Sequence, residues 1–157
     1  MLQGSSSMAI LPACICKQRI PDNIWNSYFK FSVERNPWDK SISHYYWLQH
    51  QRNTEFSFHE YIKRSACINY PIYTDPSKGN IIVDKVLKYE QLTDDLSTVF
   101  EKLGIPFDGV LGSKAKSQYR KDRRPYREVF SEDEMKPYVD TIAQRYKREI
   151  ELHGYDF

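Results

Sequence analysis

The sequence predicts one α/β domain with a small parallel sheet, and three observations lead to this prediction. Segments with the two-residue alternation of a strand take turns with segments that have the apolar periodicity of a helix, an order typical of layered α/β folds. The chain has 157 residues, near the usual size of one domain. It contains no internal repeat, heptad array or low-complexity tract that would indicate another architecture.

The strand and helix around residue 35 are the clearest local prediction. Residues 29–33 alternate aromatic or aliphatic side chains with polar ones, which predicts a strand with one face more buried than the other. Asn36 is a favoured N-cap, Pro37 suits the first helical position, and Asp39 complements the helix dipole in the first turn. We therefore expect a helix over 37–51.

The remaining elements follow from periodicity, caps and breakers. In chain order, we expect a helical turn over 22–27, a helix over 56–66, a loop over 69–80, and over 81–89 one strand or two strands joined by a bend near Asp84. We then expect a helix that Thr93 caps and Gly104 ends, and a last helix that Ser131 and Glu134 open as a capping box and Gly154 ends.

The strand end that leads into this helix is a common place to hold an anion. Arg35 lies at the junction, and Ser43 lies two turns into the helix, where it could face the same side. A guanidinium offers a planar fork of donors and a hydroxyl adds one more, so the two together could hold one phosphate group. On the residues alone, Arg35 could instead pair with a carboxylate and Ser43 could be an ordinary helix residue.

One segment has a known counterpart. The residues from Val33 to Tyr45, VERNPWDKSISHY, are similar to the 3′-phosphate-binding motif of sulfotransferases that use 3′-phosphoadenylyl sulfate (PAPS), in the carbohydrate-type branch. In that family the arginine and the serine eight residues later bind the 3′-phosphate of the nucleotide. The resemblance places these roles on Arg35 and Ser43.

Two further segments extend the resemblance to most of the chain. Residues 84–92 are similar to the family's strand ending "RYE-x-L", with Lys88 where arginine is usual. Residues 126–157, which close on HGYDF, are similar to its last helix and "FGY-x-F" ending. The resemblance implies a three-layer P-loop-kinase-like sandwich that is N-terminally incomplete, because nothing before Trp25 matches the family's 5′-phosphosulfate loop. We therefore expect a tail or truncated remnant over 1–20 and a sulfotransferase-like domain over 21–157.

The implied reaction is transfer of a sulfuryl group from PAPS to a hydroxyl of a carbohydrate, with adenosine 3′,5′-bisphosphate (PAP) as product. The catalytic residues stay unassigned. The loop 113–127 holds seven lysines and arginines against Asp122 alone, although the whole chain has a net charge of only +2. The family places nucleotide contacts in this loop, and Lys116, Ser117 and Arg124 are the candidates here.

Two alternatives stay open. One is a non-catalytic nucleotide- or glycan-binding module with a degenerate sulfotransferase fold. The other is a small nucleic-acid-binding domain that uses the basic loop with Tyr119 and Tyr126 as stacking platforms. The motif at Arg35 favours the sulfotransferase and the nucleotide- or glycan-binding module over the nucleic-acid-binding domain, so we expect no nucleic-acid partner. Glu90 is expected to be structural, as a hydrogen-bond acceptor at a strand end.

The remaining expectations concern metals, membranes and association. Cys14 and Cys16 have no second pair or nearby histidine, so no metal site is expected. The apolar run over 8–16 is too short to span a bilayer and is a poor signal peptide, which predicts a cytoplasmic protein if the N-terminus is native. An incomplete sheet would leave an exposed edge and favour a homo-oligomer.

Overall fold

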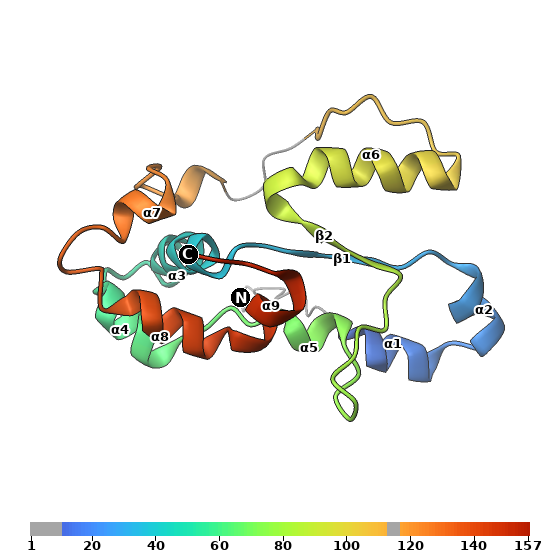
Figure 1. Ribbon diagram of the computed structural model, residues 1–157, viewed down its shortest axis with the longest axis horizontal. Coiled ribbons are helices and arrows are strands. Elements are labelled where there is room, and N and C mark those ends of the chain that lie inside the picture. Colours follow the sequence, from blue (N-terminus) through green and yellow to red (C-terminus); the bar gives the residue numbers. More distant parts are fainter. Residues whose placement is uncertain (1–10, 113–116) are drawn as a thin grey trace, which may run out of the picture. The chain divides into compact units, whose positions relative to one another are not determined.

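The computed structural model describes residues 11–112 and 117–157. This part of the chain is α/β, with helices and a small two-stranded parallel sheet (Figure 1), which confirms the predicted fold class at this level. The chain divides into two compact units. The first runs through Ser32 and includes Asn69–Val86, and the second consists of Val33–Ile68 and Leu87–Phe157.

The helices and strands are α1 (Ala13–Arg19), α2 (Asp22–Ser27), β1 (Phe31–Glu34), α3 (Pro37–Arg52), α4 (Phe58–Arg64), α5 (Tyr70–Tyr73), β2 (Lys85–Lys88), α6 (Leu92–Leu103), α7 (Tyr126–Val129), α8 (Tyr138–Arg145) and α9 (Lys147–His153), with 3-10 turns η1 (Tyr89–Gln91) and η2 (Ser117–Tyr119). Helix α1 lies inside the range 1–20 that was expected to be a tail.

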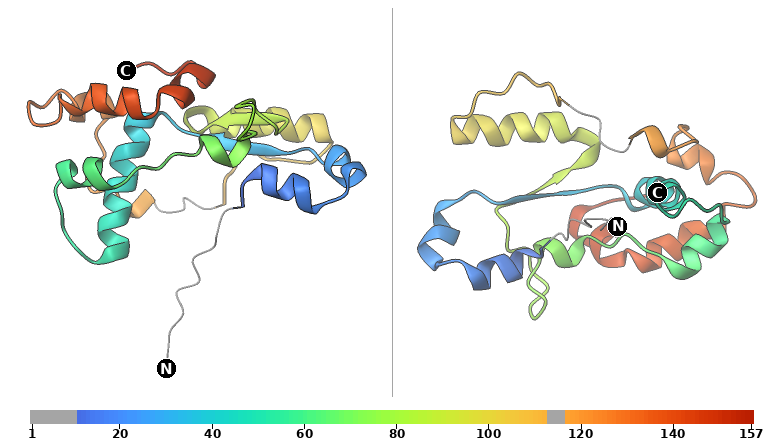
Figure 2. Two further views of the ribbon diagram at one scale, coloured as in Figure 1. Left: turned by 90° about the horizontal axis from the view of Figure 1, so that it is seen from below. Right: turned by 180° about the vertical axis from the view of Figure 1, so that it is seen from behind.

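In the first unit, α1 packs against α5 (Figure 2), and an antiparallel bridge joins Thr74 to Ile81. Helix α5 lies within the predicted loop over 69–80, so that prediction missed one short helical turn. Phe31 was expected on the buried face of its strand, but its side chain is 42% exposed, whereas Glu34 at the end of β1 is fully buried. The alternation therefore misjudged the inward face, because a charged side chain can be buried when it has an ion-pair partner.

The second unit holds the main hydrophobic core around α3. The buried members of this core are Trp38, Ile42, Leu48, Phe58, Tyr61, Ile62, Val129, Phe130, Ile142 and Tyr146. They come from α3, α4, α7, α8 and the residues that directly follow α7 and α8, so α3 is covered by segments from both halves of the sequence. Because these segments pack around α3, the residues at both ends of this helix are held in fixed positions.

Helix α3 was predicted over 37–51 and is found over Pro37–Arg52, which confirms it. The helical turn predicted over 22–27 is α2, Asp22–Ser27, which confirms it.

The two predicted caps at Thr93 and Ser131 were wrong. Helix α6 begins at Leu92, directly after the turn η1, so Thr93 lies inside the helix and no side chain caps its start. Asp95 in the first turn of α6 accepts a hydrogen bond from the Lys88 N–H at 2.8 Å.

The predicted capping box at Ser131 does not form. The Ser131 hydroxyl donates to the Glu128 carbonyl at 2.7 Å, and α8 starts only at Tyr138, directly after Pro137. A proline favours the start of a helix and opposes its interior, so Pro137 sets this boundary. Gly104 and Gly154 do end α6 and α9 in the left-handed conformation, with φ of 67° and 62°, as the sequence predicts.

Candidate functional site

The N-terminus of α3 is organised by Asn36. Its side-chain oxygen accepts hydrogen bonds from the backbone N–H groups of Trp38 at 3.1 Å and Asp39 at 3.2 Å, which confirms the predicted N-cap. Asn36 is itself buried. The cap fixes the direction in which the chain leaves β1 and thereby the position of Arg35, the residue before it.

The three segments that carry the family resemblance meet at Asn36. The Asn36 N–H donates to a Glu90 carboxylate oxygen at 2.6 Å. Its side-chain amide lies 3.4 Å from the Tyr126 hydroxyl and 3.4 Å from the Asp156 carbonyl. The other Glu90 oxygen accepts from the Tyr155 hydroxyl at 3.3 Å. Glu90 is thus a hydrogen-bond acceptor that joins two segments, which confirms its predicted structural role.

The C-terminal residue closes this junction from the apolar side. The Phe157 ring packs edge-on against Trp38, with ring centres 5.5 Å apart, and against Tyr126 at 5.9 Å. The Trp38 indole N–H donates to the Val139 carbonyl at 3.1 Å. The end of the chain and the start of α3 are therefore held together by both packing and hydrogen bonds.

A buried ion network lies beneath the same junction. The Lys40 ammonium contacts Glu34 at 2.6 Å and Glu149 at 3.2 Å, and all three side chains are at most 5% exposed. Glu34 also accepts from the Arg35 N–H at 3.0 Å. Burial would lower the pKa of Lys40, but the two carboxylates outweigh it and hold that pKa above its ordinary value. This network joins the end of β1, the first turns of α3 and α9.

Arg35 occupies the position that the sequence predicts, and it is already paired. Its guanidinium contacts one oxygen of Asp39, at 2.6 Å from Nε and 2.5 Å from Nη2. It also stacks on the Tyr89 ring at 4.3 Å. The sequence left open whether Arg35 pairs with a carboxylate. In the structure it does, and its partner is Asp39, one helical turn later.

The second oxygen of Asp39 forms an ion pair with another arginine, Arg120. Arg120 contacts it at 2.5 Å through Nη1, and its other donors reach the Asp122 carbonyl at 2.5 Å and the Arg124 carbonyl at 2.8 Å. Sequence reasoning missed Arg120, because seven basic residues share its loop and nothing in their spacing shows which one faces α3. Asp39 thus lies between two guanidinium groups, each on one of its oxygens.

Ser43 lies one turn beyond Asp39 and hence on the same face of α3. It is half-buried, and its hydroxyl makes no hydrogen bond to the described part of the chain. The start of α3 therefore presents two guanidinium groups, one hydroxyl and the positive end of a helix dipole on one side. An oxyanion with several acceptor oxygens could take all of these donors, if it displaced the carboxylate of Asp39.

In the described part of the basic loop, Arg124 is neutralised by acidic residues of the same unit. Arg124 pairs with Asp122 at 2.6 Å and with Glu132 at 2.8 Å, and these two carboxylates raise the pKa of Arg124. The hydrogen bonds that Arg124 donates in turn lower the pKa of Asp122. The predicted contact at Arg124 is thus occupied by two carboxylates. Lys116 lies outside the described residues, and Ser117 is described only by its backbone, as the first residue of η2.

The turn η2 rests on the same face of α3, further along the helix. The rings of Tyr119 and His50 stack with their centres 4.0 Å apart, and these two residues line an open pocket of about 380 Å³ that begins at Tyr46. Tyr46 follows Ser43 by three residues, so the pocket continues the face that carries Asp39 and Ser43. The basic loop is therefore anchored over α3 by an aromatic stack as well as by Arg120.

Within 11–112 and 117–157, no three histidine, cysteine, aspartate or glutamate side chains are grouped so as to hold a metal ion. In the same ranges, no helix combines the length and the apolar character needed to cross a bilayer.

No protein-family model and no solved structure matches this chain. It is similar to an uncharacterized protein of Archaeoglobus fulgidus, with 35% identity over an alignment 118 residues long that covers 71% of this chain and 98% of the archaeal protein. That identity over nearly the whole archaeal protein shows common descent. The chain belongs to the same family as this uncharacterized archaeal protein.

Proposed function

We propose that this chain binds the 3′-phosphate of a nucleotide at the start of α3 and acts as a PAPS-dependent sulfotransferase on a hydroxyl, in particular one of a carbohydrate. The observation that carries the proposal is the placement of Arg35, Arg120 and Ser43 around Asp39. Two guanidinium groups that share a carboxylate have the donor pattern that a phosphate monoester takes. The likeness of the segment around Arg35 to the sulfotransferase motif supplies the identity of the nucleotide.

The proposed fold is the three-layer P-loop-kinase-like sandwich of that family. It is supported by two parallel strands with helices between them in sequence, since parallel strands need a crossover connection. The convergence of the three resembling segments at Asn36 supports it as well, because each segment contributes a contact there.

In the proposed reaction an acceptor oxygen attacks the sulfur of PAPS, the bond from that sulfur to the nucleotide's phosphate oxygen breaks, and PAP leaves. Arg35, Arg120 and Ser43 would hold the 3′-phosphate and so fix the nucleotide relative to the acceptor. They do not touch the transferred group. The residue that takes the acceptor proton stays unassigned.

A second candidate function is a binding module that holds a nucleotide or glycan without turnover. Asp39 bears on both candidates alike, because a carboxylate that already holds both guanidinium groups lowers the gain from binding a phosphate. The two functions share the nucleotide site and differ only in sulfuryl transfer.

The test is calorimetric titration of the whole chain with PAP. We expect binding that weakens roughly ten- to hundredfold in Arg35→Ala, since a hydrogen bond to a charged group contributes about 1.5–3 kcal/mol. Arg35→Lys keeps the charge but loses the fork of donors, so it should fall in between. Arg123→Ala is the matched control, because Arg123 is exposed and has no ion-pair partner among the described residues.

Equal affinity in the wild type and Arg35→Ala would refute the nucleotide site. Transfer of labelled sulfate from PAPS to a panel of free sugars separates the two candidates: transfer supports the enzyme, and PAP binding without transfer supports the module.

A further inference from the structure

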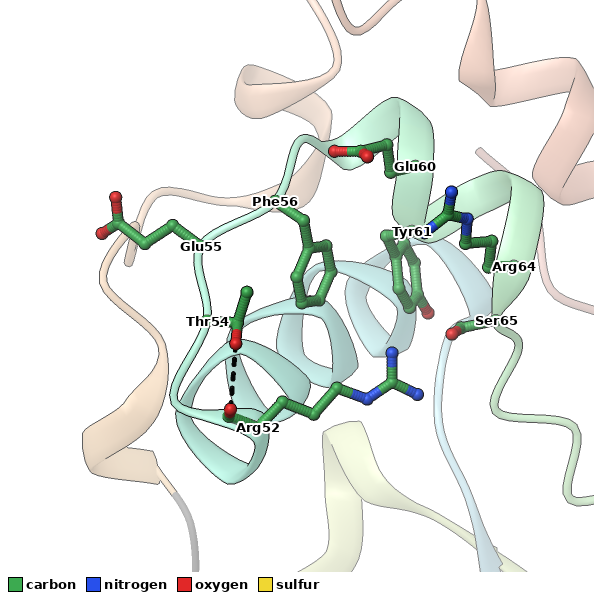
Figure 3. A pocket seen from close by; sticks show the side chains of 8 residues that line it. All are labelled: Arg52, Thr54, Glu55, Phe56, Glu60, Tyr61, Arg64 and Ser65. Atoms are coloured by element: carbon green, nitrogen blue, oxygen red, sulfur yellow. Dashed lines mark hydrogen bonds between the residues drawn. The ribbon is translucent and has the colours of Figure 1, made fainter.

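A separate pocket lies at the other end of α3, between the last turn of that helix and α4. Its volume is about 240 Å³, and Figure 3 shows the side chains that line it. These are Arg52, Thr54, Glu55, Phe56, Glu60, Tyr61, Arg64 and Ser65. The pocket is smaller than the roughly 300–1,000 Å³ of sites for drug-sized molecules, so it suits one ring with its substituents.

The two arginines of this pocket differ from most others in their unit. Arg52 and Arg64 come from the last turns of α3 and α4, and neither guanidinium has an ion pair or hydrogen bond within residues 11–112 or 117–157. The remaining arginines of the second unit, Arg123 apart, all have a partner in the described chain. Two of the three unpartnered arginines therefore line the same pocket.

The two carboxylates of the pocket do not neutralise these arginines by contact. Glu60 completes the capping box of α4, since its carboxylate accepts from the Ser57 N–H at 3.0 Å. The hydrogen bonds from Ser57 and, to a smaller extent, the nearby charge of Arg64 lower the pKa of Glu60. The Glu55 carboxylate points away from the rings in Figure 3 and lies 3.4 Å from the Lys121 ammonium. The guanidinium groups thus remain the available charged donors of the pocket.

The aromatic wall is held in place from behind. The Phe56 carbonyl accepts from the Tyr45 hydroxyl at 2.9 Å and from the Gln49 amide at 2.8 Å. The hydroxyl of Tyr61, which is 1% exposed, hydrogen-bonds His44 Nδ1 at 3.1 Å. In Figure 3 the Arg52 side chain runs below both rings, with its guanidinium toward Ser65. The aromatic wall is thus positioned without a ligand.

We propose that this pocket binds one acidic sugar unit, a pyranose that carries a carboxylate or a sulfate. The oxyanion takes the donors of Arg52 and Arg64, and the C–H face of the ring packs on the exposed part of Phe56. The hydroxyls of Thr54 and Ser65 lie at the rim, where sugar hydroxyls can reach them. The binding of this sugar is independent of the proposed function.

The experiment follows the backbone amide signals of the labelled whole chain by NMR during titration with sugars. The probes are methyl glucuronide and glucose 6-sulfate, with methyl glucoside as the neutral sugar and sodium sulfate as the anion without a ring. We expect both acidic sugars to shift the signals of residues 52–65 and to bind at least about tenfold more tightly than either control probe. The double variant Arg52→Gln with Arg64→Gln should lose this binding, and Arg123→Gln should retain it.

Three results would overturn the proposal: no saturation by either acidic sugar up to about 10 mM, which corresponds to negligible affinity; equal affinity for methyl glucoside or for free sulfate; or unchanged affinity in the double variant. Circular dichroism of the variants shows that they are folded. The titration with PAP is run in parallel, so its failure with intact sugar binding contradicts only the proposed function, and the reverse contradicts only this pocket.

Discussion

The two ends of α3 present arginines in opposite states of pairing. At the N-terminal end, Arg35 and Arg120 share the two oxygens of Asp39. At the C-terminal end, Arg52 and Arg64 line one pocket, and neither guanidinium makes an ion pair or hydrogen bond to the described chain. The affinity of a site for an anion depends on the number of its arginines and on the ion pairs that these arginines must break when the anion binds. The two ends should therefore respond differently to the same ligands.

The helix dipole adds to this contrast. The N-terminus of α3 carries partial positive charge and favours an anion, whereas its C-terminus carries partial negative charge and favours the side chain of Arg52 itself. The N-terminal end therefore combines a favourable field with a carboxylate that contacts both of its arginines, whereas the C-terminal end has neither that field nor a carboxylate in contact with its arginines.

The largest expected effect removes the buried charge on which the N-terminal end is built. Lys40→Met should lower the free energy of unfolding by about 3–5 kcal/mol, because it leaves Glu34 and Glu149 buried without their cation. Urea denaturation measures it. Lys63→Met at the exposed surface of α4 is the control and should change stability by less than about 0.5 kcal/mol. A loss below about 1 kcal/mol for Lys40→Met would show that the network is not essential.

The same network predicts a pH dependence. The pKa of Lys40 is raised in the folded chain, so its contribution to stability is complete below the unfolded value of about 10.4 and is lost as the pH rises through the folded value. Denaturation midpoints of the wild type should therefore fall at alkaline pH. The midpoint of Lys40→Met should fall less over the same range, and parallel curves would contradict this assignment.

The next largest effect is expected for Asn36, the N-cap that positions Arg35. Asn36→Ala should cost about 1–2 kcal/mol of stability, because the N–H groups of Trp38 and Asp39 lose their acceptor. It should also weaken the binding of PAP, since Arg35 is then less well positioned. Asn36→Asp restores an acceptor and should recover most of the stability, so equal losses in both variants would mean that capping is not the cause.

Removing the carboxylate that contacts both arginines should bring the two ends closer in behaviour. Asp39→Asn should raise the affinity for PAP about fivefold, since a partly exposed ion pair contributes up to about 1 kcal/mol and need no longer be broken. Calorimetry measures it, and Asp133→Asn, which removes an exposed carboxylate paired with Lys136, is the control. Unchanged or weaker binding in Asp39→Asn would show that Asp39 positions Arg35 and Arg120 rather than competing with the ligand.

The smallest effect is expected in the basic loop. Arg124→Gln should change the affinity for PAP by less than about twofold, because this guanidinium is held by Asp122 and Glu132 and the Arg120 contact uses only the Arg124 backbone. A loss as large as that of Arg35→Ala would restore Arg124 as a nucleotide contact.

Much of the N-terminal end of α3 could be predicted because its signals are local. Asn36, Pro37 and Asp39 act within one turn, and the placement of Arg35 at the strand end follows from them. The resemblance to the sulfotransferase motif covers the same stretch. A local signal can still fail when a stronger one lies nearby: the capping box at Ser131 does not form, because Pro137 moves the helix start to the residue after it.

The sequence by itself determined the α/β class, the bounds of α3, its N-cap and the presence of an arginine at the strand end, since each depends on residues within a few positions. Only the tertiary structure decided which residues surround that arginine. Asp39 meets Arg120 across 81 positions of sequence, and Lys40 meets Glu149 across 109. It also decided that Arg52 and Arg64 share a pocket. Side-chain pairing between distant segments depends on how the helices pack. Composition and periodicity do not specify which distant residues this packing brings together.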